Sequence, residues 1–419
     1  MAEKRQKIPL LLKLKRIKNS KPIDWLNSIF SNVKHPRTFK GIPNRILLIR
    51  NDRIGDAVVT LPVIRDIKLN YPDIKIDVLV SRRNKFVFKN LSYVDDVIES
   101  NWTPENLSRL YKLPLLGEIF QFFRYTFLPY LFSNNFRQKI NQLKDQLKEK
   151  KYDVAADLVG LKRNALLCRM ISRFSIGPKK LLTYNLYDYY IDSNWVALGD
   201  KDFMTKKIEN ALINGMNLKL EKRNTSLPLT NNHLSRTEGF TYDVLVHLGS
   251  TELRKLSAGK EKELIEYLSG LNVLVTDKSE TSNFYSLKKL FINKSNIKFK
   301  IFNSLEETVQ DCFKSRLLLC YDGGQAHYLS QFARTITVFG PGSVALWRPY
   351  EFADYSLLEK DTNGTEALIS RGAFRHIAIY FPIWCRPCFD IGCREKPCLG
   401  EIRTDFIMYI IKKYCLNAD

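Results

Sequence analysis

Long apolar runs are missing from this sequence, and their absence excludes several classes of protein. No uninterrupted stretch of about 18–20 apolar residues exists, so we expect no membrane-spanning helix. The stretch that comes nearest, residues 114–132, carries Glu118 and Arg124. The apolar run Leu10 to Leu12 is short and ends at Lys13, so no secretory signal is expected either.

Repeats and common nucleotide-binding signatures are also missing. There is no repeat at a solenoid period, no DNA- or RNA-binding motif, no Walker A pattern and no G-x-G-x-x-G fingerprint. Acidic residues are scarce: 44 Asp and Glu stand against 66 Lys and Arg, which gives a net charge of +22. Such an excess attracts nucleic acid, anionic lipid or phosphorylated small molecules. Without a recognition motif, we expect no specific nucleic-acid binding.

What is present describes a folded protein of two domains. A chain of 419 residues exceeds one average domain, and its 45% hydrophobic and 26% charged residues are typical of globular proteins. We predict a basic N-terminal arm over residues 1–41 and a first domain over 42–225. A polar linker over 226–240 leads to a second domain over 241–419.

Two segments have features of a surface that meets lipid. The basic arm contains four apolar residues on one helical face: Trp25, Leu26, Ile29 and Phe30. It is either a solvated arm with a docking helix or an interfacial anchor on anionic lipid. Residues 103–150 are predicted to be helical and are rich in Phe and Tyr. They either pack in a core or contact lipid or a lipid-linked acceptor.

Short buried strands alternate with helices in both predicted domains. In the first domain, strands are predicted at Ile46–Ile49, Ile76–Val80 and Asp153–Leu158. In the second domain, they are predicted at Asp243–His247, Val273–Thr276, Ile297–Phe302, Arg316–Cys320 and Thr335–Phe339, with helices at Leu305–Phe313 and Gln325–Phe332. This alternation indicates an α/β fold of two Rossmann-like doubly wound domains facing across a cleft. Ligands bind such sheets at the carboxyl ends of the strands.

The first loop of interest is Arg50-Asn51-Asp52-Arg53-Ile54-Gly55-Asp56, directly after the first predicted strand. Gly55 permits a tight turn from strand to helix. Asp56 has two interpretations. It is either the N-cap of the next helix, the commoner role for Asp at this spacing, or a carboxylate that takes a proton from a hydroxyl.

Glycine-rich loops follow two later strands. Tyr321-Asp322-Gly323-Gly324-Gln325-Ala326-His327 opens a helix, and Phe339-Gly340-Pro341-Gly342-Ser343 follows the next strand. Glycines let backbone N–H groups approach a ligand closely, and a helix N-terminus favours phosphate. Two such loops on one rim favour a phosphate or nucleotide site over two ordinary turns.

A third loop, His247-Leu248-Gly249-Ser250-Thr251, opens the second domain and precedes several cations. Arg254, Lys255 and Lys260 are either counterions for a diphosphate or the solvated start of a basic helix.

Four of the eight cysteines lie close together, at Cys385, Cys388, Cys393 and Cys398. Such clustering is typical of metal ligation or of reduced thiols rather than of a disulfide scaffold. Four thiolates suit a structural zinc or iron ion, and a closed site of this kind leaves no position for catalysis. Reduced structural thiols are the alternative.

Taken in order, these motifs resemble the lipopolysaccharide heptosyltransferase family, glycosyltransferase family 9. The run from Arg45 to Pro62 is the most specific piece, and Tyr152–Leu158 and Ile176-Gly177 fit as well. Asp322 to His327 resembles a family signature that usually reads Asp-Thr-Gly-x-x-His. The run from Phe339 to Pro349 and the four-cysteine segment complete a resemblance that covers about residues 44–405.

The resemblance implies a GT-B fold, an inverting transfer without a catalytic metal, and a role for each matching residue. Asp56 would be the general base. The helix start at Gly323 and Gly324, with Lys255, would stabilise the leaving diphosphate. Asp322 would contact the donor sugar, and His327 would lie close by. Glu280 would bind the ribose, and Ser250 and Gly340 would complete the donor site. Gly323 stands where the family has Thr, so one hydroxyl is lost and the donor preference stays open.

The function implied by this resemblance is transfer of heptose from ADP-heptose to a lipopolysaccharide core acceptor. We expect a cytoplasmic protein, peripheral on the anionic inner face of the inner membrane. The same fold acting on a protein or another glycan is one alternative. A non-catalytic protein that binds a sugar nucleotide or nucleic acid is the other.

Overall fold

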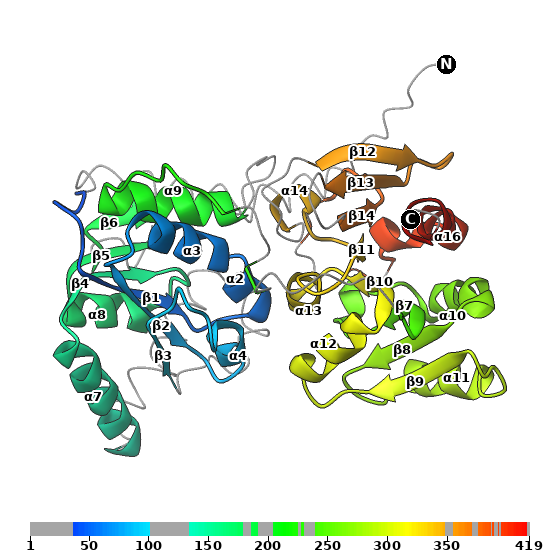
Figure 1. Ribbon diagram of the computed structural model, residues 1–419, viewed down its shortest axis with the longest axis horizontal. Coiled ribbons are helices and arrows are strands. Elements are labelled where there is room, and N and C mark those ends of the chain that lie inside the picture. The colour runs from blue at the N-terminus through cyan, green and yellow to red at the C-terminus, as the bar shows by residue number, and fades with distance from the viewer. Residues whose placement is uncertain are drawn as a thin grey trace.

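The computed structural model describes residues 37–100, 134–178, 186–191, 204–224, 228–229, 239–347, 355–370, 376–386, 388, 393 and 395–416. The predicted arm up to residue 36, the aromatic segment up to residue 133 and most of the linker lie outside these ranges. The described residues form two α/β halves side by side, each built on its own sheet (Figure 1).

The first half contains a parallel sheet of six strands in the order β3-β2-β1-β4-β5-β6. Its strands are β1 (Arg45–Arg50), β2 (Lys75–Val80), β3 (Asp96–Glu99), β4 (Tyr152–Asp157), β5 (Ser172–Pro178) and β6 (Tyr189–Ile191). Its helices are α2 (Ile54–Val58), α3 (Leu61–Asn70), α4 (Lys85–Phe88), α7 (Asn134–Glu149), α8 (Lys162–Ile171) and α9 (Met204–Met216). The three strands predicted in this half are confirmed.

Helices cover both faces of this sheet, which explains why its strands are apolar throughout. Along β1, Leu47 and Ile49 pack with residues of α7 and α8, whereas Ile46 and Leu48 pack with residues of α3 and α9. A strand with period-2 side chains and two covered faces needs apolar residues at every position. The continuous apolar run in the sequence follows from this arrangement.

The second half contains an eight-stranded sheet in the order β12-β13-β14-β11-β10-β7-β8-β9. Its strands are β7 (Tyr242–His247), β8 (Val273–Asp277), β9 (Ile297–Ile301), β10 (Ser315–Tyr321), β11 (Thr335–Phe339), β12 (Tyr355–Lys360), β13 (Glu366–Ser370) and β14 (His376–Tyr380). Six strands run parallel, and β13 and β12 extend the sheet as an antiparallel pair beyond β14. All five strands predicted here are confirmed.

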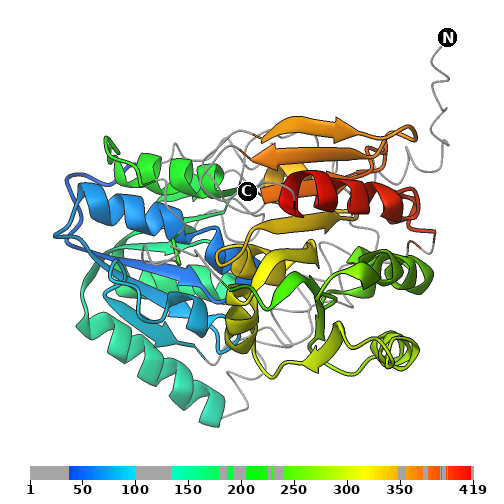
Figure 2. The same cartoon turned by 45° about the vertical axis from the view of Figure 1, so that its right-hand side comes forward.

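Helices also lie on both faces of the second sheet. They are α10 (Ala258–Tyr267), α11 (Ser282–Leu290), α12 (Leu305–Phe313), α13 (Gly324–Leu329), α14 (Val344–Trp347), α15 (Pro397–Gly400) and α16 (Thr404–Ile411), with short turns at Glu252–Arg254, Leu268–Gly270 and Lys412–Leu416. The sequence predicted α12 correctly but extended α13 to Phe332, three residues too far. On the outer side, α16 contacts α10 (Figure 2).

Each sheet has the Rossmann strand order. The chain starts in the middle of the sheet, builds one flank outward and then crosses back to build the other flank from β4 or β10. The points where the order reverses lie between β1 and β4 and between β7 and β10, and doubly wound sheets bind ligands there. The loops from Arg50 and from Tyr321 leave the sheets at the edge where these points lie.

These two edges face one another. The helix α2, which follows β1, packs against α13, which follows β10 (Figure 1). Nearby, the rings of Phe86 in α4 and Tyr328 in α13 make an edge-to-face contact with centroids 4.9 Å apart. One apolar cluster runs through both halves across this contact. The two halves are therefore joined directly at their candidate ligand-binding edges.

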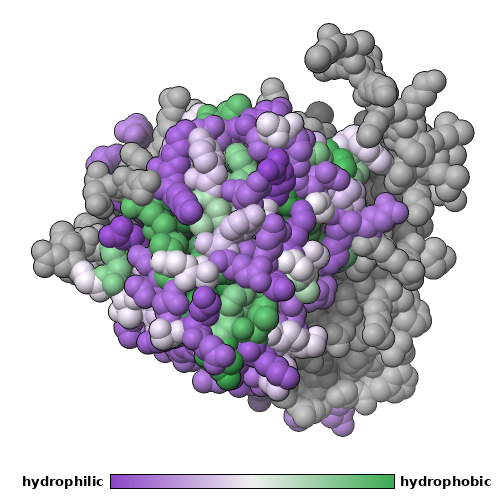
Figure 3. All heavy atoms as spheres, turned by 90° about the vertical axis from the view of Figure 1, so that its right-hand side faces the viewer, coloured by the Kyte–Doolittle hydropathy of each residue, from purple (hydrophilic) through white to green (hydrophobic). Residues whose placement is uncertain are grey.

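The outer face of the second half is mostly hydrophilic. Figure 3 shows small hydrophobic areas separated by hydrophilic residues, beside atoms that are not described. Exposed apolar side chains on α11 and just after it include Tyr285, Leu290 and Ile292. Among the described residues, no helix is both long enough and apolar enough to cross a membrane.

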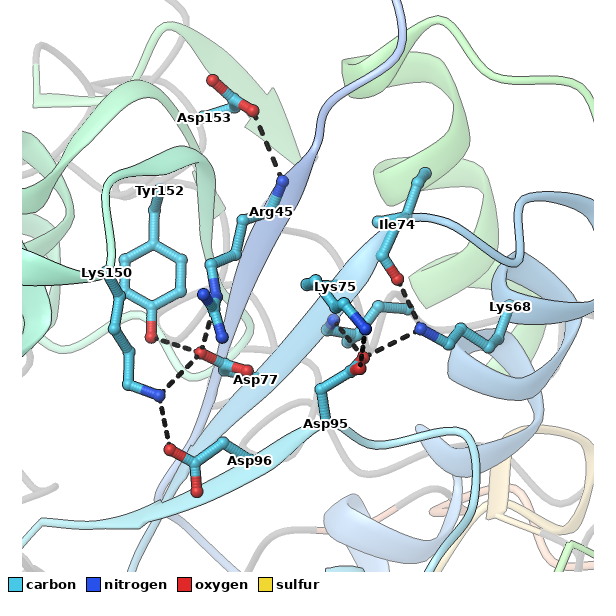
Figure 4. A network of polar contacts seen from close by, with 11 residues as sticks. Arg45, Lys68, Ile74, Lys75, Asp77, Asp95, Asp96, Lys150, Tyr152 and Asp153 are labelled. Atoms are coloured by element: carbon cyan, nitrogen blue, oxygen red, sulfur yellow. Dashed lines mark hydrogen bonds and ion pairs between the residues drawn. The ribbon is translucent and has the colours of Figure 1, made fainter.

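A charged network holds the amino ends of the strands in the first sheet (Figure 4). The carboxylate of Asp77 on β2 is fully buried. One of its oxygens accepts a hydrogen bond from the Tyr152 hydroxyl at 2.8 Å, and Arg45 Nε and Lys150 Nζ lie 3.1 and 3.3 Å from it. Because Arg45 begins β1 and Tyr152 begins β4, this carboxylate ties three neighbouring strands together.

Replacing Tyr152 with Phe removes only the hydroxyl of this network. We expect Tyr152→Phe to lower the free energy of unfolding by about 1.5–3 kcal/mol, because the lost hydrogen bond has a buried charged acceptor. Urea unfolding measures the change. Tyr285→Phe, at a side chain that is 56% exposed, is the control and should change the value by less than about 0.5 kcal/mol. Equal effects of the two substitutions would contradict a structural role for the network.

Candidate functional site

Arg50 organises the loop after β1. Its side chain is only 2% exposed although it carries a charge. Its guanidinium donates to the backbone oxygen of Asp56 at 2.9 Å and to that of Leu158, after β4, at 2.6 Å. It also lies 3.4 Å from the carboxylate of Asp52 and 3.5 Å from that of Asp56. One buried cation therefore fixes the turn and faces two carboxylates.

Asp56 does not cap its helix. The helix α2 begins at Ile54 with Arg53 at the N-cap position, so Asp56 is the third helical residue. Its backbone oxygen is held by Arg50 and by the hydroxyl of Thr60, at 2.8 Å. The side chain is about one-fifth exposed. The N-cap interpretation is therefore wrong, and a partly exposed carboxylate with a fixed backbone suits proton transfer.

Buried amides support this loop from below, and the sequence analysis missed them. Asn51 and Asn164 exchange side-chain hydrogen bonds at 3.2 and 3.3 Å. Asn164 also donates to Asp157, which accepts two backbone N–H bonds and the Tyr187 hydroxyl as well. The signal in the sequence was an Asn directly after a strand, which by itself is typical of any turn.

Asp52 is a second carboxyl group beside Asp56. Burial raises the pKa of Asp52 to about 7, and the charge of Asp56 adds to this rise, while the charge of Arg50 opposes it. At neutral pH, Asp52 thus carries a proton in about half of the molecules. When Asp52 is protonated, the charges of Asp56 and Arg50 cancel, and when it is ionised the three groups carry one net negative charge.

Asp322 lies opposite, at the start of the glycine-rich loop after β10. Its carboxylate is buried, and it pairs with Arg254 at 3.3 Å. It also lies against the backbone of Gly342, where an added Cβ would be only 2.4 Å from Oδ2. Burial raises the pKa of Asp322, and the charges of Arg254 and Arg386 oppose the rise. The two glycine-rich loops are therefore in direct contact, as expected for one site.

Gly324 and Gly55 allow the two halves to approach. A Cβ on Gly324 would lie 3.0 Å from the backbone nitrogen of Gly55, and one on Gly55 would lie 3.0 Å from Cδ2 of His327. His327 is buried, its ring contacts Trp347 edge to face at 6.1 Å, and burial lowers its pKa to about 4. The loop that carries Asp56 thus touches the loop that begins with Asp322.

The position of Gly323 faces three polar groups, and the nearest of them, Oε1 of Gln325, would lie 3.3 Å from an added Cβ. A Cβ there would lie 3.8 Å from the hydroxyl oxygen of Ser250 and 3.9 Å from Nη1 of Arg254. Ser250 itself donates to the backbone oxygen of Asp322 at 3.3 Å. The hydroxyl of Ser250, on the loop after β7, therefore lies beside position 323.

Lys255 is buried rather than solvated. Its ammonium lies 3.5 Å from the carboxylate of Asp277, at the end of β8. Its charge also acts on Glu261, whose pKa is raised to about 7 by burial and which accepts a bond from the Tyr321 hydroxyl at 2.6 Å. The interpretation of Lys255 as part of a solvated basic helix start is wrong, because a cation buried beside carboxylates is a fixed charge.

Two predicted donor-site residues lie at the periphery of this group. Glu280 follows β8, is half exposed and pairs with Lys288 at 3.6 Å. Gly340 follows β11, and a Cβ there would lie 3.1 Å from Cδ1 of Leu399. The described contacts bring Ser250, Asp322, Gly323, Gly324 and His327 together. They do not bring Glu280 to them.

The cysteine segment packs beneath the second glycine-rich loop. The backbone N–H of Cys388 donates to the oxygen of Pro341 at 2.9 Å. Burial raises the pKa of Cys398, Arg386 opposes the rise, and the charges of Cys385, Cys393 and Cys388 add to it. No disulfide joins any of the eight cysteines, all of which lie in the described part of the chain.

The chemistry of the four-thiol set fits a zinc or iron ion. In the part of the chain that the structure describes, however, no three His, Cys, Asp or Glu side chains converge on a possible metal position.

Two Rossmann-like halves with apposed carboxyl ends define the GT-B class of fold, which confirms the predicted architecture. No protein-family model matches the chain, and no curated protein matches it. Solved structures do match. E. coli heptosyltransferase WaaC with ADP-2-deoxy-2-fluoro heptose has a TM-score of 0.59 and 17% identity, over 88% of this chain and 99% of that one.

Two further solved structures have the same fold. WaaC with ADP has a TM-score of 0.56 and 18% identity over 73% of this chain and 91% of that one. E. coli ADP-heptose lps heptosyltransferase II has a TM-score of 0.52 and 16% identity over 76% and 91%. The fold that the sequence motifs implied is therefore the fold of these heptosyltransferases.

The close approach of the two halves predicts a strong effect of a single methyl group. We expect Gly324→Ala to lower the free energy of unfolding by about 1–3 kcal/mol, because the added Cβ meets backbone rather than a movable side chain. Urea or thermal unfolding measures it. Gly259→Ala is the matched control, since nothing lies within 4 Å of its Cβ. A neutral Gly324→Ala would show that the contact is loose.

The raised pKa of Asp52 predicts pH-dependent stability. The folded protein holds this proton up to about pH 7, whereas the ordinary pKa is 3.8. Its stabilising contribution is complete below pH 3.8 and is lost as the pH rises to about 7. Asn cannot ionise. The free energy of unfolding of Asp52→Asn, relative to that of the wild type, should therefore rise by about 1–3 kcal/mol as the pH increases from about 5 to about 8.

Chemical unfolding at several pH values tests this expectation. Asp145→Asn, at a carboxylate that is 65% exposed, is the control. Its difference from the wild type in free energy of unfolding should not change with pH over this range. A flat difference for Asp52→Asn as well would contradict the raised pKa.

Proposed function

We propose that this protein is a glycosyltransferase that moves heptose from ADP-heptose to a lipopolysaccharide core acceptor. The observation that carries the proposal is the contact between Gly55 and Gly324, which brings the loop of Asp56 against the loop of Asp322. A base on one half and a polar, cation-rich group on the other is the arrangement that sugar transfer needs. The solved structures with this fold that contain ADP or an ADP-heptose analogue support the choice of donor.

In the proposed reaction, Asp56 takes the proton of the acceptor hydroxyl. The acceptor oxygen attacks the anomeric carbon of the donor from the face opposite the diphosphate, and the bond from that carbon to the diphosphate oxygen breaks. The configuration is inverted, and the proton stays on Asp56. Arg50 holds the backbone of this residue and places a positive charge near its carboxylate.

Fixed positive charges on the other half would stabilise the leaving diphosphate. Lys255 and Arg254 are held by carboxylates, so neither has to be oriented during the reaction. The backbone at Gly323 and Gly324 lies nearby, with Ser250 as a hydroxyl donor. Asp322 would contact the donor sugar, with His327 behind it. Because protein cations supply the charge, we propose that the transfer needs no catalytic metal.

The net charge of +22 supports an acceptor and a location with negative charge. We propose that the protein works on the cytoplasmic face of the inner membrane, where the lipid surface and the phosphorylated lipopolysaccharide core are both anionic. A protein or another glycan as acceptor would need the same base and donor site, so the acceptor is decided by assay.

We propose that the four thiols take up a structural zinc or iron ion, because four thiolates close together in the sequence supply the donors that a tetrahedral site needs. Binding would have to draw the thiols together, since they do not converge in the described structure. Metal analysis of the purified protein tests it. About one zinc or iron per chain is expected, and Cys398→Ser should lose it, whereas Cys312→Ser, at a buried cysteine outside the segment, should keep it. If the purified wild type contains no metal, the proposal is wrong and the four cysteines are reduced structural thiols.

Asp56→Asn tests the proposed base. With ADP-heptose and extracted lipopolysaccharide core, we expect turnover to fall about 100- to 10,000-fold, because Asn cannot accept a proton. Binding of ADP-heptose, measured by calorimetry, should persist. Asp145→Asn should retain turnover.

The same assay with a panel of nucleotide sugars separates the alternatives. Transfer from another donor would change the sugar but keep the mechanism. Donor hydrolysis without transfer to core would point to a protein or another glycan as acceptor. Tight donor binding with no turnover in the wild type would make the protein a sensor of sugar nucleotides.

A further inference from the structure

Arg386, within the cysteine segment, occupies a position that the proposed mechanism does not use. Its guanidinium donates to the backbone oxygen of Gly342 at 2.6 Å and to that of Phe381 at 3.3 Å. It also lies over the ring of Tyr380 at 4.8 Å. Two carbonyl acceptors and an aromatic face hold this cation at one place in the fold.

Gly342 connects Arg386 to the candidate donor site. The carboxylate of Asp322 packs so closely on Gly342 that an added Cβ would be 2.4 Å from Oδ2. Arg386 therefore binds the backbone of Gly342, the residue against which the carboxylate of Asp322 packs. The charge of Arg386 also reaches Asp322, as does that of Arg254. Arg254 is 36% exposed, whereas Arg386 is held by two carbonyl oxygens and an aromatic ring.

The rest of the cysteine segment contacts the same loops. Cys388 donates to the oxygen of Pro341 at 2.9 Å, and Leu399 fills the space beside Gly340. Lys396 donates to the backbone oxygen of Glu252, in the turn after Ser250. This segment therefore contacts two separate loops of the candidate donor site, the loop after β11 and the loop after β7, and helps to hold both in place.

We infer that Arg386 is a positioning residue for the donor sugar: it fixes the loop at Gly342 and thereby the carboxylate of Asp322. The inference rests on the proposed function, because Asp322 would contact the sugar of a nucleotide-sugar donor. It adds a residue whose effect is on the sugar end of the donor. The nucleotide end lies with the cations of the loop after β7 and depends less on Gly342.

Donor binding by Arg386 variants tests this inference. Calorimetry with ADP-heptose and with ADP is compared for the wild type, Arg386→Met and Arg386→Lys. We expect Arg386→Met to weaken ADP-heptose binding tenfold or more and ADP binding by less than about threefold. The reason is that the hydrogen bonds donated by the charged guanidinium are lost near the sugar and not near the nucleotide. In steady state, the KM for the donor should rise more than kcat falls.

Arg386→Lys keeps the charge and an apolar stem but lacks the planar fork of the guanidinium, so an intermediate loss is expected. Arg403→Met is the matched control, because Arg403 is an exposed arginine of the same half that pairs with Asp405. It should leave both affinities unchanged. If Arg386→Met fails to fold, the ratio of the two affinities in Arg386→Lys decides.

Three outcomes overturn the inference. A folded Arg386→Met with wild-type affinity for ADP-heptose removes the positioning role. An equal loss for ADP and ADP-heptose identifies general loosening of the second half. A wild type that binds no nucleotide sugar overturns the proposed function, and this inference with it.

Discussion

The contact between α2 and α13 is the constraint on which the candidate site depends. It joins the carboxyl edge of one sheet to that of the other, and it exists because Gly55 and Gly324 present no side chains to each other. Everything proposed for the reaction follows from this geometry. The base comes from one half and the donor loops from the other, so neither sheet alone carries a complete site. The supporting contacts of Phe86 and Tyr328 belong to the same joint.

Around the contact between α2 and α13, ion pairs form both within a loop and between loops. Arg50 holds two carboxylates and a carbonyl oxygen from the turn after β4, Arg254 reaches Asp322, and Lys255 reaches Asp277. Buried ion pairs of this kind gain little net stability, because desolvation opposes their attraction. Their value here is orientation, since they fix the conformations and relative positions of these loops before a ligand arrives. The high pKa of Asp52 follows first from its burial, and the charge of Asp56 adds to the rise.

The sequence predicted the sheets well where strands are covered on both faces. Runs such as Ile46 to Ile49 are apolar at every position, which a buried strand requires. The strands β12 and β13 were missed because their residues are largely half-exposed and alternate irregularly. The strands β5 and β14 were missed although they are mostly buried. The helix start at Asp56 was misplaced because an Asp in a first helical turn looks the same as an N-cap until the backbone is known.

The sequence indicated several residues of the candidate site but not the contacts between them. Motif order identified Asp56, Asp322 and His327, since each follows a strand at the edge where ligands bind. Nothing in the sequence indicated that Arg50 is buried or that Lys255 pairs with Asp277, because such pairs join residues that are distant in the chain or hidden by the fold. Arg386 was overlooked for the same reason, as attention fell on the thiols around it.

The apolar cluster that runs through both halves has a consequence for motion. Separating the halves to admit a donor or release a nucleotide must expose the ring faces of Phe86 and Tyr328 and the backbone at Gly324 to water. Hydration of apolar surface costs about 25 cal/mol per Å², so the open state is the less populated one in the absence of ligand.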